Sequence, residues 1–178
     1  MSSDLLQPTT HKLQELDIKQ TARLLLVSIE RQTLQLFLDG QLIREFAVST
    51  SRNPPSCIEN SLGTPTGLHR IAEKHGDKAP LGSVFKGRVQ VAKHYSALPA
   101  KEQANNLVTT RILWLEGLET GHNQGPGRDS YQRYIYIHGT NHEEKIGSPA
   151  SAGCVQLRNA EMIELFDAVQ TGDQVYIA

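Results

Sequence analysis

Alternation of hydrophobic and polar residues dominates the chain from Arg23 onward and predicts β-strands. In the stretch 33–48, Leu34, Leu36 and Leu38 recur at every second position before Asp39-Gly40, a dipeptide typical of tight hairpin turns. The stretches with strand patterns are 23–29, 33–48, 67–72, 83–91, 108–118, 133–139 and 174–178. Many short strands of this kind favour a β-sandwich or a barrel-like fold.

Helical spacing marks a segment near each end of the chain. Residues 5–20 contain four leucines and predict a loose helical arm. The stretch after Asn159 predicts a clearer helix, which Gly172 would end. Asn159 is of a type that caps helices, and Glu161 would lie in the first turn, where a carboxylate suits the helix dipole. The apolar stripe of this helix comprises Met162, Ile163, Leu165, Phe166 and Val169.

Together these patterns predict a mostly β fold with one or two helices, the clearest of them after the loop that carries Cys154. Residues 1–22 would form an N-terminal arm and residues 23–178 one domain, because no linker divides them. The stretches 49–67 and 121–130, rich in glycine, proline and small polar residues, predict long loops.

Composition fits an ordinary soluble globular protein and argues against two kinds of partner. Hydrophobic residues make up 38% and charged residues 21%, and the formal net charge is -1. Lysines and arginines are scattered, so no basic stripe favours nucleic acid. No apolar run approaches the ~18 residues of a membrane span. The two cysteines, Cys57 and Cys154, form neither a disulfide framework nor a CxxC pair.

The beginning of the sequence bears on where the protein works. A secretory signal needs an apolar run of roughly 7–15 residues after a basic start. Asp4, Lys12 and Glu15 interrupt the first stretch, so the sequence as given predicts a cytoplasmic protein. If an exporting segment has been removed from this sequence, the expected location becomes periplasmic.

Candidate chemistry lies in two separate segments. In "RYIYIHGTN" the alternation points the isoleucines toward the core and the tyrosines and His138 toward the other face. Cys154 follows in a run of small residues, directly after Gly153. A thiolate is the nucleophilic form of cysteine, and an imidazolium or a nearby helix N-terminus lowers the thiol pKa. We therefore expect a reactive thiol with a lowered pKa.

In this hypothesis Cys154 is the nucleophile, and His138 takes the thiol proton and later returns it to the leaving amine. Gly153 gives a substrate carbonyl room and lets its own amide and that of Cys154 face an oxyanion. Each residue alone is more often structural, but the spacing of the pair favours catalysis. Zinc is the competing use, since His138 and His142 have i, i+4 spacing, but clear further ligands are lacking. Cys57 lies in a Pro/Ser loop and is interpreted as incidental.

These residues resemble the catalytic domain of the L,D-transpeptidase (YkuD) family. The family signature runs H-G-T, a spacer, then S-H-G-C-[IV]-R-[ML]-x-N, and this chain reads "HGTN…IGSPASAGCVQLRN". The likeness extends to the opening strands "LLVSIERQTLQLFLDGQLIREFAVSTS", to "GTPTGLHRI" and to the closing "FDAVQTGDQVYIA". It covers residues 23–178.

The resemblance implies a β-rich sandwich and a cysteine that acts on peptidoglycan stem peptides, with no metal and no organic cofactor. Cys154 matches the nucleophile, His138 the general base, Gly153 with Cys154 the oxyanion donors, and Ser151 the serine of the tight turn. A thiol of this family is also expected to be acylated by a carbapenem. The substrate-binding candidates are Ser151, Tyr136, Arg158 and Arg133.

Two positions depart from the family pattern. Ala152 occupies the place of the usual histidine and Gln156 that of the usual arginine. The nucleophile and the base remain, so we expect the chemistry to survive. Arg158 or Arg133 would supply a cation in place of the missing arginine.

The resemblance leaves the second half of the reaction open between water and an amine. With a cytoplasmic location and the altered "SAGCVQ", we expect water, which makes the protein an L,D-carboxypeptidase that removes the terminal D-Ala from tetrapeptides in muropeptide recycling. The alternative is an L,D-transpeptidase that crosslinks stem peptides or exchanges D-amino acids. A third possibility is a non-catalytic peptidoglycan-binding module.

Overall fold

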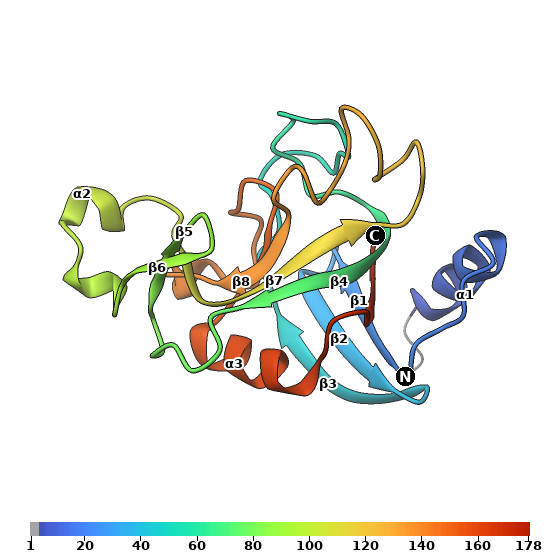
Figure 1. The fold of residues 1–178 in the computed structure, drawn as a ribbon, viewed down its shortest axis with the longest axis horizontal. Helices are drawn as coiled ribbons and strands as arrows, with labels where there is room; N and C mark the ends of the chain where they lie inside the picture. The colour runs from blue at the N-terminus through green and yellow to red at the C-terminus, as the bar shows by residue number, and fades with distance from the viewer. Residues whose placement is uncertain (1–3) are drawn as a thin grey trace.

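The computed structural model describes residues 4–178 and, within them, places ten strands in one mixed sheet (Figure 1). The main path runs β3-β2-β1-β10-β4-β7-β5-β6, and β8 pairs with β7 and with β9. The strands are β1 (Arg23–Ser28), β2 (Thr33–Leu38), β3 (Gln41–Ala47), β4 (Gly67–His75), β5 (Val84–Lys86), β6 (Val89–Ala92), β7 (Val108–Gly117), β8 (Tyr136–Gly139), β9 (Val155–Leu157) and β10 (Gln174–Ile177). The predicted mostly β fold is confirmed.

Three helices accompany the sheet within residues 4–178. They are α1 (Leu6–Glu15), α2 (Ala100–Gln103) and α3 (Asn159–Ala168), with short 3-10 turns at Tyr95–Ala97 and Glu143–Lys145. The predicted arm and the predicted closing helix correspond to α1 and α3, whereas α2, with four residues, is too short to leave a periodic pattern. None of the helices within 4–178 is both long and apolar enough to cross a bilayer.

The core lies between the sheet and α3. Met162, Leu165 and Phe166 of α3 are buried against a cluster that includes Leu113 of β7 and Ile137 of β8. The last strand, β10, lies in the middle of the sheet, parallel to β1 and antiparallel to β4. The chain therefore completes its sheet only when its final residues are in place.

The arm is packed, not loose. Leu5 and Leu6 lie against Leu24, Leu26 and Phe37, on the face of β1 and β2 opposite α3. With α3 on one face and α1 on the other, β1 is buried on both sides, which explains its uninterrupted apolar run.

Three strand expectations need correction. The predicted strand 133–139 begins only at Tyr136, because Tyr134 lies in a turn with φ of 56°. In β2 the alternation holds, but Phe37 on the opposite face is buried as well, because Leu5 and Leu6 cover that face, while Leu38 at the end of the strand is 39% exposed. The register shift between β2 and β3 lies in β3, where Ile43 is the extra residue. The stretch 83–91 is not one strand but the hairpin β5–β6, which turns at Gly87-Arg88. The Asp39-Gly40 turn is present as predicted, with φ of 49° and 80°.

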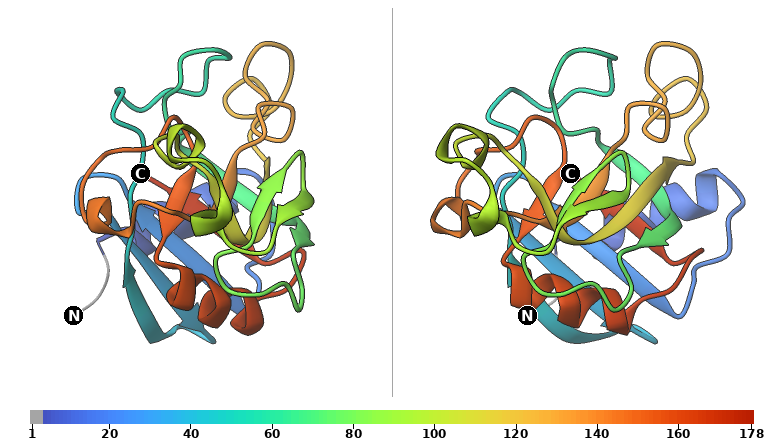
Figure 2. Two further views of the ribbon diagram at one scale, coloured as in Figure 1. Left: turned by 90° about the vertical axis from the view of Figure 1, so that its left-hand side faces the viewer. Right: turned by 60° about the vertical axis from the view of Figure 1, so that its left-hand side comes forward.

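The predicted loops 49–67 and 121–130 rise side by side on the side of the sheet away from α3 (Figure 2). The amide of Glu59 donates to the carbonyl of Gly127 at 2.8 Å, which joins them. They border the sheet face onto which β8 and β9 direct their polar residues.

Candidate active site

The parallel pairing of β8 with β9 brings His138 and Cys154 to one face of the sheet. Ile137 is in register with Val155 and His138 with Gln156, and Ile137 and Val155 both point into the core. Cys154, one residue before Val155, therefore shares the opposite face with His138 on the neighbouring strand. Diagonal neighbours on adjacent strands are about 7–8 Å apart, a gap that an imidazole spans.

The sulfur of Cys154 lies beside the backbone at the start of β8, next to Tyr136. The backbone N–H of Tyr136 donates to Sγ at 3.4 Å, and the thiol donates to the carbonyl of Tyr134 at 3.6 Å. The side chain packs on a cluster of Phe85, Ile112, Trp114 and Tyr136, yet the residue as a whole stays partly exposed. The thiol is thus enclosed on one side and accessible on the other.

The turn before Cys154 is braced by Ser151 and requires Gly153. Ser151 is buried, and its hydroxyl donates to the carbonyl of Cys154 at 2.6 Å and accepts from the Gly153 N–H at 3.3 Å. Gly153 has φ of 126°, a backbone conformation that side chains disfavour. Ser151 thus lies inside the turn, and its substrate contact and the oxyanion role of Gly153 stay predictions.

His138 is buried and oriented by the backbone. Its Nδ1 lies 2.6 Å from the carbonyl oxygen of Gly139, which only accepts hydrogen bonds, so Nδ1 carries the proton and Nε2 is the basic nitrogen. Burial lowers the pKa of His138 from its ordinary 6.5 to about 4. At neutral pH the imidazole is neutral and able to accept a proton.

The resting thiol is neutral as well, which corrects the expectation of a lowered pKa. Burial raises the pKa of Cys154 to about 11, although the Tyr136 N–H and the charge of Arg133 act in the opposite direction. The predicted helix N-terminus does not act directly, because β9 separates Cys154 from α3. Within residues 4–178, Sγ and the imidazole have their hydrogen bonds with backbone groups and none with each other. The thiol must rotate from the Tyr134 carbonyl toward Nε2 before it reacts.

A neutral pair predicts a steep pH profile for thiol alkylation. In a Cys57→Ala background, iodoacetamide is expected to modify Cys154 slowly at pH 7 and about tenfold faster per pH unit up to about pH 10, since thiolate is the reactive form. Mass spectrometry of timed samples measures the rate. A rate that levels off near pH 6 would instead indicate a thiolate–imidazolium pair and contradict this description.

Asn159 joins β7 and the end of β8 to α3, but not as the cap that its residue type suggested. The N-cap position of α3 is Arg158, and Asn159 is its first residue. The Asn159 side chain is buried, accepts from the hydroxyls of Thr109 (2.6 Å) and Thr110, and donates to the Thr140 carbonyl at 2.8 Å. Glu143 provides the cap, since its carboxylate accepts from the Asn159 backbone N–H at 2.6 Å.

Asn159→Ala is therefore expected to destabilise the fold by about 2–4 kcal/mol, because the buried Thr109 and Thr110 hydroxyls lose their acceptor and the Thr140 carbonyl loses its donor. Urea unfolding measures this loss of stability. Asn106→Ala is the control, because Asn106 is exposed and its side chain makes one hydrogen bond, of 3.3 Å. A loss below about 0.5 kcal/mol, as expected for the control, would show that the network is dispensable.

The two candidate arginines lie in different places. Arg133 is half-buried beside the thiol and donates to the carbonyls of Ser56 (3.1 Å) and Gly63 (2.8 Å), so it fastens the loop 49–67. Arg158 is at the start of α3, 3.6 Å from Glu161. Gln156 is buried, and Ala152 lines a shallow pocket with Arg133.

An aromatic wall lies beside Cys154, and the sequence predicted its tyrosines on the strand of His138 but not Trp114 or Tyr131. The ring of Trp114 stacks on that of Tyr131, with centroids 3.9 Å apart, and meets Tyr136 edge-on at 5.7 Å. The guanidinium of Arg88 lies 4.2 Å from the centre of the Trp114 ring. The signal available was the single tryptophan of the chain on a predicted strand.

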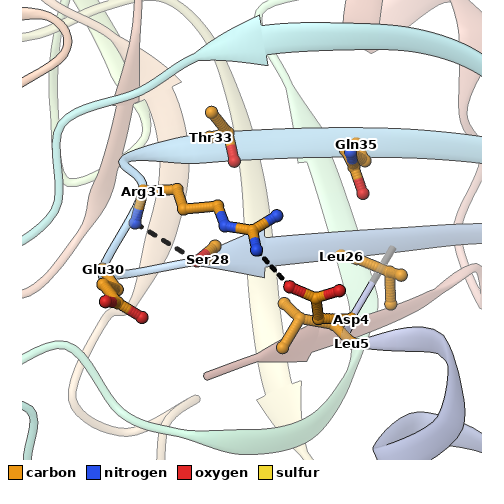
Figure 3. Close-up of a pocket in the computed structure, with 8 residues that line it drawn as sticks. All are labelled: Asp4, Leu5, Leu26, Ser28, Glu30, Arg31, Thr33 and Gln35. Atoms are coloured by element: carbon orange, nitrogen blue, oxygen red, sulfur yellow. Dashed lines mark hydrogen bonds and ion pairs between the residues drawn. The ribbon is translucent and has the colours of Figure 1, made fainter. Parts of the chain in front are cut away.

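Other parts of the described chain offer less chemistry. A pocket between the start of α1 and the strands β1 and β2 contains the ion pair of Arg31 with Asp4 (Figure 3). The two exposed charges satisfy each other, and such surface pairs contribute little energy. Within residues 4–178, no group of three histidine, cysteine, aspartate or glutamate side chains is placed to hold a metal ion.

Comparison with known proteins finds L,D-transpeptidases both by sequence and by fold. The chain is 44% identical over 45 residues to the Bacillus subtilis protein named "Putative L,D-transpeptidase YqjB", a match that covers 25% of this chain and 26% of that one. L,D-transpeptidase 3 from Mycobacterium tuberculosis superposes with a TM-score of 0.56 at 15% identity, over 88% of this chain and 61% of that one. Its complex with a faropenem-derived adduct gives a TM-score of 0.53 at 16% identity, over 88% and 60% of the two chains.

The matched part is less than two-thirds of each of these relatives, and the structural likeness shows the fold alone. The family model covers nearly the whole chain, since the L,D-transpeptidase catalytic domain matches residues 22–177. That match includes both segments that meet at the thiol. The chain belongs to the YkuD family of L,D-transpeptidase catalytic domains.

Proposed function

We propose that this protein is a cysteine-dependent L,D-carboxypeptidase that removes the terminal D-Ala from peptidoglycan tetrapeptides. The observation that carries the proposal is the pairing of β8 with β9, which places a partly exposed thiol diagonally from a neutral imidazole whose Nε2 is basic. In this proposal Cys154 is the nucleophile and His138 the general base.

In the first half of the reaction, Nε2 of His138 takes the thiol proton as Sγ attacks the carbonyl of the third stem residue. The tetrahedral oxyanion forms beside the turn of Gly153 and Cys154. As it collapses, the bond to the D-Ala nitrogen breaks and His138 returns the proton to that amine. D-Ala leaves, and the tripeptide stays bound to Cys154 as a thioester.

In the second half, water attacks the thioester while Nε2 takes one of its protons. The carbon–sulfur bond then breaks and the thiolate recovers the proton from Nε2. The tripeptide leaves as a carboxylate after the second proton of the water molecule passes to solvent. The hydrogen bond from the Tyr136 amide to Sγ favours the thiolate as leaving group, because it stabilises the charged form.

Water as the acceptor is supported by the surroundings of the thiol. An amine acceptor on a second stem peptide has to be bound in a subsite of its own, whereas water needs only access to the thioester and to Nε2 of His138. At the position of the family histidine, Ala152 offers a methyl group, which is neither a base nor a hydrogen-bond partner. The proposal includes a cytoplasmic location, where the substrates would be soluble tetrapeptides and no wall is present to crosslink. Cell fractionation with an antibody would test this location.

Incubation with disaccharide-tetrapeptide, with and without an acceptor amine, tests the proposal when the products are weighed. The expected product is disaccharide-tripeptide in both samples. Crosslinked tetra–tri species or exchange of the terminal D-residue would show an L,D-transpeptidase instead. A covalent adduct with faropenem or a carbapenem, read as a mass increase on Cys154, is also expected, because the same thiol would open the lactam ring.

A further inference from the structure

Arg88 lies at the turn of the hairpin β5–β6 and extends over the aromatic wall beside the thiol. Its guanidinium carbon is 4.2 Å from the centre of the Trp114 ring and 5.5 Å from that of Tyr134. One of its nitrogens donates to the hydroxyl of Tyr136 at 3.1 Å. A guanidinium over aromatic rings is held at a fixed position without losing its charge.

The rings under Arg88 are themselves fixed. Tyr131 stacks on Trp114 with an interplanar angle of 3°, and the indole N–H of Trp114 donates to the Tyr131 carbonyl at 3.0 Å. The Tyr131 hydroxyl donates to Glu73 at 2.5 Å, and His75 contacts the other oxygen of that carboxylate at 2.8 Å. Glu73 is therefore occupied by Tyr131 and His75.

No carboxylate within residues 4–178 forms an ion pair with Arg88, although the nearby charge of Glu73 contributes to raising the pKa of Arg88. The ion pairs of the described chain join other residues, and the hydroxyl of Tyr136 accounts for one of the five N–H groups of Arg88. The side chain is partly exposed, so the remaining donors are open to a ligand. Guanidinium binds a carboxylate through two parallel hydrogen bonds, and in a peptide backbone the carboxylate is the C-terminal group.

Tyr136 links this cation to the nucleophile. Its backbone N–H contacts Sγ of Cys154 at 3.4 Å, and its hydroxyl accepts from Arg88. One tyrosine side chain thus spans the space between the thiol and the guanidinium. In a peptide that ends one residue after the attacked carbonyl, the terminal carboxylate lies about one residue, ~3.8 Å, further along the chain.

We propose that Arg88 binds the free C-terminal carboxylate of the donor peptide and thereby restricts cleavage to the last peptide bond. The inference rests on the proposed function, because it assigns the specificity of that same site. Arg88 acts as a specificity residue: it holds the leaving D-residue over the Trp114 wall, and the attacked carbonyl then faces Cys154.

Turnover of two stem tetrapeptides, one with a free C-terminal carboxylate and one with a carboxamide, tests this inference. The wild type is expected to prefer the acid in kcat/KM by about tenfold to a hundredfold, as hydrogen bonds to a charged group allow. Arg88→Gln is expected to bring the ratio near one by losing acid turnover, while amide turnover changes less than about twofold. Arg88→Lys, which keeps the charge without the fork, is expected to be intermediate.

Lys86→Gln is the matched control. It removes a positive charge from the same hairpin, but Lys86 is exposed and pairs with Glu102 at 3.3 Å. It is expected to keep the wild-type preference for the acid. A merely structural role for Arg88 would lower the turnover of both peptides together and leave their ratio unchanged, which would overturn the inference.

Binding to Cys154→Ala protein separates this inference from the proposed function. Trp114 is the single tryptophan and lies under Arg88, so its fluorescence reports the titration. The acid is expected to bind more tightly than the amide, and Arg88→Gln in this background is expected to erase the difference. If it does so while the wild type forms no tripeptide, the inference stands and the carboxypeptidase proposal fails. Equal binding of acid and amide to the Cys154→Ala protein overturns the inference.

Discussion

Cys154→Ala is expected to abolish tripeptide formation and covalent acylation together, while the protein remains folded. Loss of a catalytic nucleophile costs about 10⁴- to 10⁶-fold in rate. Without Sγ the thioester cannot form, even though His138 and the turn around Gly153 remain. The side chain is small and partly exposed, so its truncation removes little packing. Product mass after incubation with tetrapeptide, and protein mass after faropenem, measure the two losses.

Cys57→Ala is the matched control, because Cys57 also lies near a histidine. Its sulfur is 3.6 Å from Nε2 of His122 and 3.7 Å from the Thr66 carbonyl, in the loops that rise above the sheet. Removing this thiol is expected to leave turnover and acylation intact. If Cys57→Ala lost activity, or if Cys154→Ala kept it, the assignment of the nucleophile would be wrong. A non-catalytic binding module predicts that neither substitution matters.

The strand that carries His138 was visible in the sequence, because apolar residues on one face alternate with tyrosines and His138 on the other. In "RYIYIHG" the two isoleucines face α3 and Tyr136 faces the aromatic cluster, as the alternation predicted. The partner strand was not visible, since β9 spans only Val155–Leu157, with one polar residue among its three. A segment that short has no period, and its pairing with β8 depends on the fold as a whole.

The electrostatics of the site could not be predicted from residue types. A histidine and a nearby helix N-terminus favoured a lowered thiol pKa, but burial of Sγ against aromatic residues raises it. The group that orients His138 is the carbonyl of Gly139, and a backbone atom leaves no mark in a sequence. Arg88 is distant from the signature in sequence, and only the hairpin brings it over Trp114.

Acidification is expected to destabilise the protein by about 4 kcal/mol between pH 7.5 and pH 5, well before carboxylates are protonated. Two buried histidines, His69 and His138, cause the effect, because burial lowers the pKa of each from 6.5 to about 4. Over this range the unfolded chain binds protons that the folded protein excludes. Each histidine therefore lowers the free energy of unfolding by about 2 kcal/mol. Their contribution is complete above about pH 6.5 and lost as the pH falls to about 4.

His69 makes this effect separable from catalysis. It is fully buried at the base of the loops, with Nδ1 3.0 Å from the Gly67 carbonyl and Nε2 2.9 Å from the Ser130 hydroxyl, and it does not belong to the proposed catalytic pair. His69→Gln is expected to be less stable at pH 7.5 but to lose only about half as much on acidification, since Gln does not titrate. Urea unfolding at pH 7.5, 6.5 and 5 provides these values.

The exposed His11 on α1 provides the control, and His11→Gln is expected to keep the full pH dependence. A wild-type stability that stays level between pH 7.5 and 5 would show that His69 and His138 are protonated in the folded state. Nε2 of His138 would then hold a proton at pH 5 and could not accept one from Cys154. The unfolding measurements thus bear on catalysis as well. A free energy of unfolding that decreases as the pH is lowered supports the neutral imidazole that the proposed reaction requires as its base.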